Sequence, residues 1–235
     1  MCSKNNSKKK IDKNFIEAIS ILKNNDINYW VCQGTLLGII RDNELIPWDH
    51  DIDLAVWKGS ISKEKIKNIM FIENFTLKKK FLDSDDQLTF VKNGGREVDF
   101  NFYEIIKNEN NIRMAFVDWK VPKNKFCKLI EAISQAKSYD GNYRIFIKLF
   151  ILFQPLTSII KLFLIKKNLF YQSAGYSHPE DLVKEFTSIP FYEISITVPK
   201  KFKKYLEYIY GDQWSIPQKN FNWIKDSPST IRRVK

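Results

Sequence analysis

The stretch DHDIDLAVW places three aspartates, Asp49, Asp51 and Asp53, at alternate positions, and this spacing constrains the fold more than any other feature of the sequence. Side chains alternate between the two faces of a β-strand, so the pattern predicts a strand with one acidic face and one apolar face. Aspartate is depleted in strands, and converging carboxylates repel one another unless a cation neutralises them. A divalent ion with oxygen ligands is the natural counter-charge, and a solvated acidic edge or an Asx-type turn is the alternative.

A second predicted strand, REVDFNFYE, offers a third carboxylate. Val98, Phe100 and Phe102 alternate with polar residues, which leaves Asp99 on the polar face. The preceding QLTFVKNGG is typical of a hairpin partner that turns at residues 93–95. Two carboxylates from one strand and one from its neighbour can hold one or two Mg²⁺ ions against substrate phosphates, so the pattern favours phosphoryl transfer.

The residues before the aspartates predict a place for a phosphate. Apolar residues over 15–22 have the spacing of one helix face, and INYWVCQG predicts a short buried strand that ends at Gly34. TLLGIIR predicts a helix with Thr35 near its N-terminus. A strand, a glycine turn and a helix N-terminus together can bind phosphate, and an ordinary strand-to-helix turn is the alternative.

The net charge of +11 predicts an anionic partner, and charge alone does not rank nucleic acid, a lipid surface and a phosphorylated substrate. A chain of 235 residues with 44% hydrophobic content can bury a full core, so one α/β domain with an appendage is expected. The three cysteines are far apart and lack nearby histidines, which favours neither a disulfide framework nor a zinc site. A reducing, cytoplasmic compartment fits this cysteine usage.

Residues 143–170 combine strong hydrophobicity with charges of one sign. No acidic residue occurs between Asp140 and Glu180, and the longest charge-free run, residues 149–160, has 12 residues and contains Pro155. A bilayer-spanning helix needs about 20 residues. The segment is therefore expected to form either a core helix pair broken at Pro155 or a basic amphipathic element in a membrane interface. We favour the interface, because core helices rarely keep lysines without acidic partners.

Two segments resemble a known family. GTLLGIIRDNELIPWDHDIDL closely resembles the signature of the LicD family, which includes bacterial phosphocholine transferases and the animal fukutin and fukutin-related proteins. The elements that carry this resemblance are residues 34–38, Arg41, residues 46–49, Asp51 and Asp53. VPKKFKKYLEYIYGDQWSIP resembles the C-terminal element of the family through Pro199, Tyr205, Tyr210, Gly211, Trp214 and Pro217. The resemblance covers roughly residues 15–105 and 190–218.

The resemblance implies an α/β nucleotidyltransferase-like fold, related to DNA polymerase β, in which helices flank a mixed sheet. It implies that Gly34 and Thr35 contact phosphates, and that Asp51 and Asp53 bind metal with Asp99 as the third carboxylate. LicD-like enzymes are thought to take a phospho-alcohol from its CDP conjugate, release CMP and attach the group to a sugar hydroxyl. Phosphocholine is the first expectation here, and phosphoethanolamine or a phospho-polyol such as ribitol phosphate is the alternative.

Charge and reach suggest roles for the individual side chains. Asp51 and Asp53 are expected to ligate Mg²⁺, or Mn²⁺ in its place. Asp99 is expected to complete the coordination or to accept the proton of the attacking hydroxyl, and Asp49 suits either role. Arg41 is expected to neutralise a phosphate or to be a surface arginine.

Two tryptophans are candidates for substrate binding. Trp48 and Trp214 can stack on a base or line a pocket for a quaternary ammonium group, although core packing is the favoured role for each. His50 lies between aspartates but has the opposite strand parity, so it is predicted to be structural and not a ligand.

The sequence predicts four parts: a basic flexible tail at 1–13, a catalytic core at 14–125, a helical basic and apolar segment at 126–180, and a C-terminal element at 181–235 that completes the catalytic domain. The expected partners are a CDP-alcohol, a glycan or lipid-linked glycan, and an anionic membrane surface on which the protein lies peripherally at the cytoplasmic side. Nucleic acid is not an expected partner.

Two other functions stay open. The first is a nucleotidyltransferase that moves NMP from an NTP onto a small molecule or RNA, which would use the same aspartates. The second is a non-catalytic glycan- or nucleotide-binding domain. Clustered carboxylates argue against the second, because a site without function has no reason to bear their cost.

Overall fold

The computed structural model describes residues 12–78, 86–134 and 143–233. These residues form two compact units. The sheet unit comprises Met1–Asp118 and Tyr176–Thr230, and the helical unit comprises Trp119–Gly175 and Ile231–Lys235. Residues 1–11 of the predicted tail lie outside the described residues, and the first helix begins at Lys13.

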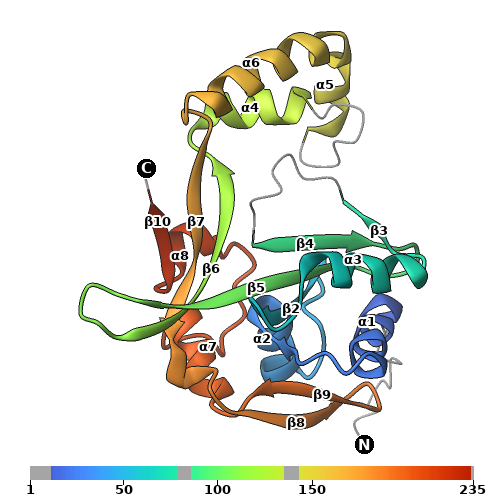
Figure 1. The fold of residues 1–235 in the computed structure, drawn as a ribbon, viewed down its shortest axis with the longest axis vertical. Coiled ribbons are helices and arrows are strands. Elements are labelled where there is room, and N and C mark those ends of the chain that lie inside the picture. The colour runs from blue at the N-terminus through green and yellow to red at the C-terminus, as the bar shows by residue number, and fades with distance from the viewer. Residues whose placement is uncertain (1–11, 79–85, 135–142, 234–235) are drawn as a thin grey trace, which may run out of the picture. The chain divides into compact units, whose positions relative to one another are not determined.

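The elements of each unit are labelled in Figure 1. The helices of the sheet unit are α1 (Lys13–Asn24), α2 (Gln33–Asp42), α3 (Lys63–Ile72), α7 (Phe202–Tyr210), α8 (Trp223–Asp226) and the short 3₁₀ helix η2 (Glu180–Leu182). Its strands are β1 (Trp30–Val31), β2 (Asp51–Trp57), β3 (Thr76–Leu77), β4 (Gln87–Val91), β5 (Glu97–Lys107), β8 (Phe186–Phe191) and β9 (Ile194–Pro199). The helical unit contains α4 (Lys125–Ser134), α5 (Arg144–Leu149), the 3₁₀ helix η1 (Ile151–Phe153) and α6 (Gln154–Lys166). Three strands begin in one unit and end in the other, β6 (Arg113–Pro122), β7 (Tyr171–Pro179) and β10 (Thr230–Arg233).

The principal sheet is mixed, with the strand order β1-β2-β5-β6-β7-β10, and β4 also pairs with β5. The central pair β2 and β5 is parallel, whereas β4 runs antiparallel to β5 in the hairpin that the sequence predicts. Strand β5 is long enough for two partners on one edge, β4 along residues 98–101 and β6 along residues 104–107. Figure 1 shows α1, α2 and α3 gathered around β2 and β5, which confirms the predicted mixed sheet flanked by helices.

Helix α1 holds the beginning of β5 in place. Asp12 caps the helix, because its side chain accepts a hydrogen bond of 3.1 Å from the backbone N–H of Phe15. The Asn14 amide donates to the backbone oxygens of Lys92 and Arg96 at 2.9 and 2.8 Å. These bonds clamp both sides of the turn that precedes β5, so the strand that carries Asp99 starts from a fixed point.

The apolar segment of the helical unit does not form one continuous helix. The helix α5 and the single turn η1 come first, and Pro155 lies in the first turn of α6, where its missing N–H has no cost. The break at Pro155, which the sequence analysis placed in the alternative of a core helix pair, is therefore present as a helix start. Helix α6 packs on α4, where Ile160, Leu164 and Ile165 contact a buried cluster of Cys127, Ile130 and Phe170. Across the described residues, no helix has the length and hydrophobicity that crossing a membrane requires.

Candidate metal centre

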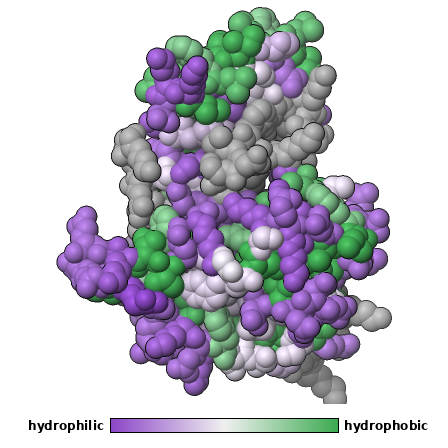
Figure 2. Space-filling model, viewed as in Figure 1, coloured by the Kyte–Doolittle hydropathy of each residue, from purple (hydrophilic) through white to green (hydrophobic). Residues whose placement is uncertain are grey.

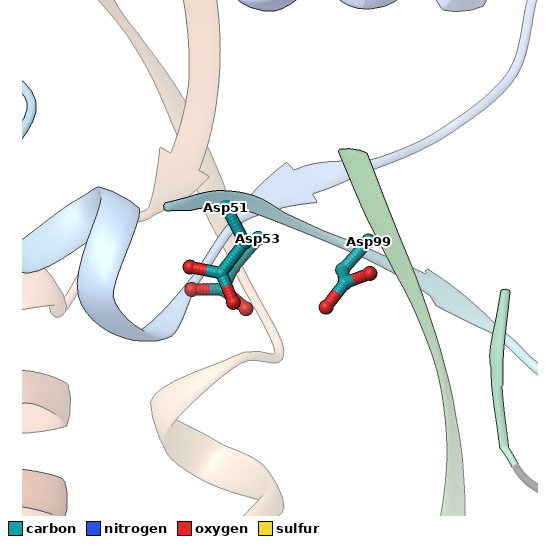
Figure 3. Close-up of side chains that lie close together, drawn as sticks. All are labelled: Asp51, Asp53 and Asp99. Atoms are coloured by element: carbon teal, nitrogen blue, oxygen red, sulfur yellow. The ribbon is translucent and has the colours of Figure 1, made fainter. Parts of the chain in front are cut away.

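Three carboxylates converge at the strands β2 and β5. Asp51 and Asp53 project from β2 and Asp99 from β5, with one oxygen of each lying within 4.8 Å of the others. Figure 3 shows the side chains of Asp51 and Asp53 side by side, with the carboxylate of Asp99 facing them. In the described part of the chain, this is the one group of three or more metal-ligating side chains that lie so close. The structure thus brings together the three aspartates for which the sequence predicts a common site.

The register of the parallel pair explains the convergence. Asp53 lies directly opposite Asp99, so both side chains project from the same face of the sheet. The neighbours Ile52 and Leu54 point to the other face and are fully buried. Asp53 and Asp99 are each only 7% exposed, so the polar face of β2 is not the solvated acidic edge that the sequence left as an alternative.

The N-terminus of α2 positions Asp53. The backbone N–H of Asp53 donates a hydrogen bond of 2.7 Å to the Thr35 hydroxyl. A second hydrogen bond joins the Thr35 backbone to the Asp53 carboxyl, and it partly offsets the larger effect of burial, which raises the pKa of that carboxyl. The first turn of a helix favours negative charge, because its unpaired N–H groups and dipole point outward. Thr35 therefore holds a carboxylate in this structure, and its predicted contact with a substrate phosphate stays a prediction.

The predicted glycine turn at Gly34 is wrong. Helix α2 begins one residue earlier, at Gln33, which has the positive φ of 47° that the junction with the strand requires. Gly34 lies inside the first turn of the helix, and a Cβ atom there would come within 2.6 Å of Asp49 Oδ2 and 3.5 Å of Asp53 Oδ2. A glycine is therefore needed here because it lets the carboxylates approach the helix closely, and not because the backbone requires an unusual conformation.

Asp49 lies next to the three carboxylates but is not part of strand β2, which begins at Asp51. The prediction that all three alternating aspartates share one strand is wrong for Asp49, because the chain is still in a turn there. Its Oδ1 atom accepts a 3.1 Å hydrogen bond from the His50 backbone, and its carboxyl group also hydrogen-bonds to Asp51. Asp49 thus reaches the site from the turn before the strand.

Burial and mutual repulsion make the cluster electrostatically costly without a cation. Burial raises the pKa of Asp51 from 3.8 to about 7, helped by the charge of Asp49 and a hydrogen bond with it. The pKa of Asp53 is also raised well above its ordinary value. Burial is the largest cause, and the negative charges of Asp51, Asp49 and Asp99 raise the pKa further. Carboxylate oxygens are the ligands that Mg²⁺ prefers, and a divalent ion would remove this repulsion. The residues present therefore fit a divalent metal ion.

The comparison with known protein families matches residues 26–129 to the family described as LicD/FKTN/FKRP, nucleotidyltransferase domain. Residues 26–129 are a LicD domain. The match contains Asp51, Asp53 and Asp99, so the carboxylate cluster lies within this domain. The family that the sequence motifs resemble is thereby confirmed.

Individual relatives of the LicD domain match over short segments. Ribitol 5-phosphate transferase FKRP of Homo sapiens and of Mus musculus is 38% identical over 39 residues, which is 17% of this chain and 8% of that protein. An uncharacterised protein of Rickettsia prowazekii is 44% identical over 36 residues, 15% of this chain and 14% of that protein. The matches thus cover less than a sixth of the length of these relatives. Among solved structures, a lincomycin-bound lincosamide antibiotic adenylyltransferase, LnuA, covers 83% of both chains with a TM-score of 0.38 and 11% identity.

The other predicted site residues of the LicD domain have partners of their own. Arg41 forms an ion pair of 2.7 Å with Asp42, and its side chain is 6% exposed, so it is not a surface arginine. Trp48 is 38% exposed, with the ammonium group of Lys219 lying 5.4 Å from its ring centre. Core packing, the favoured role for Trp48, is therefore wrong.

Two further predicted positions stay undecided in their roles. Trp214 is half-buried and donates its backbone N–H to the Gly211 oxygen at 3.1 Å. His50 is exposed beside the LicD-domain carboxylates. The roles predicted for Trp214 and His50 stay predictions.

Three residues near the site were not predicted. Gln87 donates its side-chain amide to Asp99 Oδ2 at 2.6 Å and so orients that carboxylate. Its signal was available, because Gln87 alternates with Thr89 on β4, which pairs directly with Asp99. Burial raises the pKa of both Tyr176 and Tyr210, and the charge of Asp53 contributes to each shift. Both tyrosines lie beyond the end of the LicD domain. The resemblance includes Tyr210 but gives it no role, and the fold reveals that both are near the aspartates.

Proposed function

We propose that the protein is a Mg²⁺-dependent phosphotransferase, which moves a phospho-alcohol from a CDP-alcohol to a sugar hydroxyl of a glycan and releases CMP. The observation that carries this proposal is the group formed by Asp51, Asp53 and Asp99 within a LicD domain. The name of the FKRP relatives, ribitol 5-phosphate transferase, supports the transfer of a phospho-alcohol.

In this proposal Asp51, Asp53 and Asp99 hold Mg²⁺, or Mn²⁺ in its place. The ion would draw charge from the diphosphate oxygens as the bond to the leaving group breaks. Gln87 keeps Asp99 oriented, and Thr35 keeps Asp53 oriented, so the ligands are fixed before the substrate arrives. Arg41, Gly34, Trp48 and Trp214 are the proposed contacts to the donor.

The transfer needs one acceptor for a proton. The sugar hydroxyl oxygen forms a bond to the phosphorus that carries the alcohol, the bond from that phosphorus to the CMP oxygen breaks, and CMP leaves with the electron pair. The hydroxyl proton passes to a carboxylate of the protein. We assign this role to Asp49, which hydrogen-bonds to Asp51 but stands outside the group of three.

The choice of alcohol is open to direct measurement. Choline is the first candidate and ethanolamine, glycerol or ribitol the alternatives, with the ribitol arm supported by the names of the FKRP relatives. An acceptor glycan linked to a lipid would bring the enzyme to a membrane surface, on the cytoplasmic side where CDP conjugates are available.

A nucleotidyltransferase is the second candidate function, because the matched family is described by that domain name. The same aspartates would then hold Mg²⁺ against an NTP, and the leaving group would be pyrophosphate in place of CMP. A non-catalytic binding domain would produce neither product.

The test incubates the protein with Mg²⁺ and, separately, CDP-choline, CDP-ethanolamine, CDP-glycerol, CDP-ribitol and the four NTPs. Release of CMP supports the phosphotransferase, and release of pyrophosphate supports the nucleotidyltransferase. Asp53→Asn should suppress the product by at least about a hundredfold, because it removes a metal ligand and keeps the shape. Asp212→Asn, a change at an exposed carboxylate of the sheet unit, is the matched control and should leave the rate unchanged. An equal rate in Asp53→Asn and Asp212→Asn would refute the assigned site.

A further inference from the structure

The helical unit exposes a large apolar surface. Of the 21 large apolar side chains that are exposed among the described residues, 14 belong to this unit. Figure 2 shows hydrophobic side chains gathered over α5 and α6. We call this surface the α5–α6 face, and its members are Ile145, Phe146, Leu149, Ile151, Leu152, Phe153, Leu156, Ile159, Leu162 and Phe163.

Helix α6 is apolar on both of its sides. Its inner side already packs on α4 through Ile160, Leu164 and Ile165. Its outer side presents Leu156, Ile159 and Phe163, which are 56%, 65% and 58% exposed. A helix at the surface of a soluble domain normally carries polar residues there, and contiguous exposed apolar patches mark sites of interaction.

One lysine of this segment belongs to the interior of the helical unit. The Lys161 ammonium group lies 2.7 Å from a Glu131 oxygen, and its side chain is 1% exposed. The sequence-based argument that these lysines lack acidic partners is wrong for Lys161, since its partner stands 30 positions earlier, on α4. Lys148, Lys166 and Lys167 are exposed and border the α5–α6 face.

The whole net charge of the protein belongs to the residues of the helical unit. The residues of the sheet unit include 25 basic and 25 acidic side chains, whereas those of the helical unit include 13 basic and 2 acidic ones. The full +11 therefore belongs to the helical unit, which carries the apolar face, and not to the sheet unit, which carries the three aspartates. An apolar surface within a strongly basic unit fits a partner that is apolar and anionic at once.

We propose that the α5–α6 face docks on an anionic lipid surface, with α5 and α6 lying in the plane of the membrane interface. The apolar side chains enter the boundary between headgroups and acyl chains, while Lys148, Lys166 and Lys167 contact lipid phosphates. Helix α6 has 13 residues and is too short to cross a bilayer, which requires about 20. This docking is independent of the donor that the metal centre uses.

Two other occupants fit the observations less well. A second copy of the chain would bring one helical unit with a net charge of +11 against another, and this repulsion opposes a dimer through the face. RNA would satisfy the basic residues, but seven of the ten members of the face are aliphatic, and these offer the bases no aromatic surface on which to stack.

The test measures flotation of the full chain with vesicles of phosphatidylcholine alone and of phosphatidylcholine mixed with phosphatidylglycerol. The apolar variant combines Leu152→Gln, Leu156→Gln and Ile159→Gln, at side chains that are 85%, 56% and 65% exposed. Its matched control combines Ile72→Gln, Ile112→Gln and Ile216→Gln, at sheet-unit side chains that are 75%, 51% and 56% exposed. The charge variant combines Lys148→Gln, Lys166→Gln and Lys167→Gln, and its control combines Lys65→Gln, Lys203→Gln and Lys204→Gln.

The wild type is expected to float with the anionic vesicles and to do so less as ionic strength rises. The charge variant should lose on the order of a hundredfold in partition coefficient, at roughly fivefold per lysine. The apolar variant should lose on the order of a thousandfold in partition coefficient, at roughly tenfold per side chain. Both control variants should bind like the wild type.

Several outcomes would overturn the proposal. The proposal fails if the wild type does not bind anionic vesicles, or if it binds neutral and anionic vesicles equally. It also fails if the apolar variant binds anionic vesicles as well as the wild type does. A dimer in sedimentation that only the apolar variant abolishes, without vesicle binding, would assign the face to a second copy. CMP release from the CDP-alcohols is measured in the same preparations without vesicles, so failure of docking and failure of the proposed chemistry are separately visible.

Discussion

The most informative perturbation is Asp51→Asn, because it should make the metal-free protein more stable while it removes the response to Mg²⁺. The pKa of Asp51 is raised from 3.8 to about 7, first by burial and then by Asp49. The folded protein therefore binds a proton between these values that the unfolded chain does not bind. The resulting penalty grows as pH rises through this range and is complete above pH 7.

The magnitude follows from the shift. A rise of about 3 in the pKa of Asp51 corresponds to about 4 kcal/mol. This value is an upper bound for how much the charged Asp51 carboxylate lowers the free energy of unfolding at pH 8. Asparagine keeps the shape but must still be buried as a polar amide, so we expect a gain of about 2 kcal/mol. In a chain of this size, that gain raises the Tm by about 4–8 °C. A hundredfold excess of Mg²⁺ over its Kd would stabilise the wild type by about 2.7 kcal/mol and the variant by far less.

The assay is thermal unfolding at pH 8, in EDTA and in Mg²⁺, followed by tryptophan fluorescence. The pair Trp30 and Trp57, with ring centres 4.9 Å apart, belongs to β1 and β2 and reports on the sheet that carries Asp51. The variant should be the more stable protein in EDTA and should lose that advantage in Mg²⁺, whereas Asp212→Asn should follow the wild type in both. A variant that is less stable in EDTA, or a Mg²⁺ response equal to that of the wild type, would refute the reasoning.

Three further changes probe other parts of the structure. Gly34→Ala should lower Mg²⁺ affinity and activity, because the added Cβ atom displaces Asp49. In an Asp49→Ala background the same change should be neutral or should stabilise the protein by up to about 1 kcal/mol, as measured by thermal unfolding of the double-mutant cycle. Burial lowers the pKa of His178 to about 4, so the stability of the wild type should fall by about 3 kcal/mol more than that of His178→Phe between pH 6.5 and 4 in urea unfolding. Glu131→Gln should lower the free energy of unfolding by about 3 kcal/mol, because it removes the carboxylate charge that neutralises the buried Lys161 ammonium group. Adding Lys161→Met should restore most of that loss in circular-dichroism melts.

The carboxylate cluster was predictable because it depends on two local facts. Alternation along one strand put Asp51 and Asp53 on the same face, and alternation along the next predicted strand left Asp99 on a polar face. The pairing of β2 with β5, in the register that sets Asp53 opposite Asp99, then follows from burying both apolar faces together. The two-residue alternation of β-strands was therefore enough to predict which carboxylates lie together at the site.

Other features were not predictable, because they depend on the relation between distant segments. A glycine after a strand is equally consistent with a turn and with close packing, and only the position of Asp49 shows that Gly34 makes room for a carboxylate. Tyr176 is separated from Asp53 by more than a hundred residues, so no local pattern could have connected the two.

The distribution of charge changes what the composition means. A net charge of +11 first indicates one basic protein that attracts both nucleotide and membrane. Yet the residues of the sheet unit balance their charges, and three aspartates occupy its centre, so the summed charge says nothing about the donor. In the proposed function, attraction of a diphosphate to this unit would come from local groups, namely a divalent cation held by the aspartates and the N-terminus of α2. The excess of basic residues lies in the helical unit beside exposed apolar side chains, and that is why we connect it with a lipid surface and not with the chemistry.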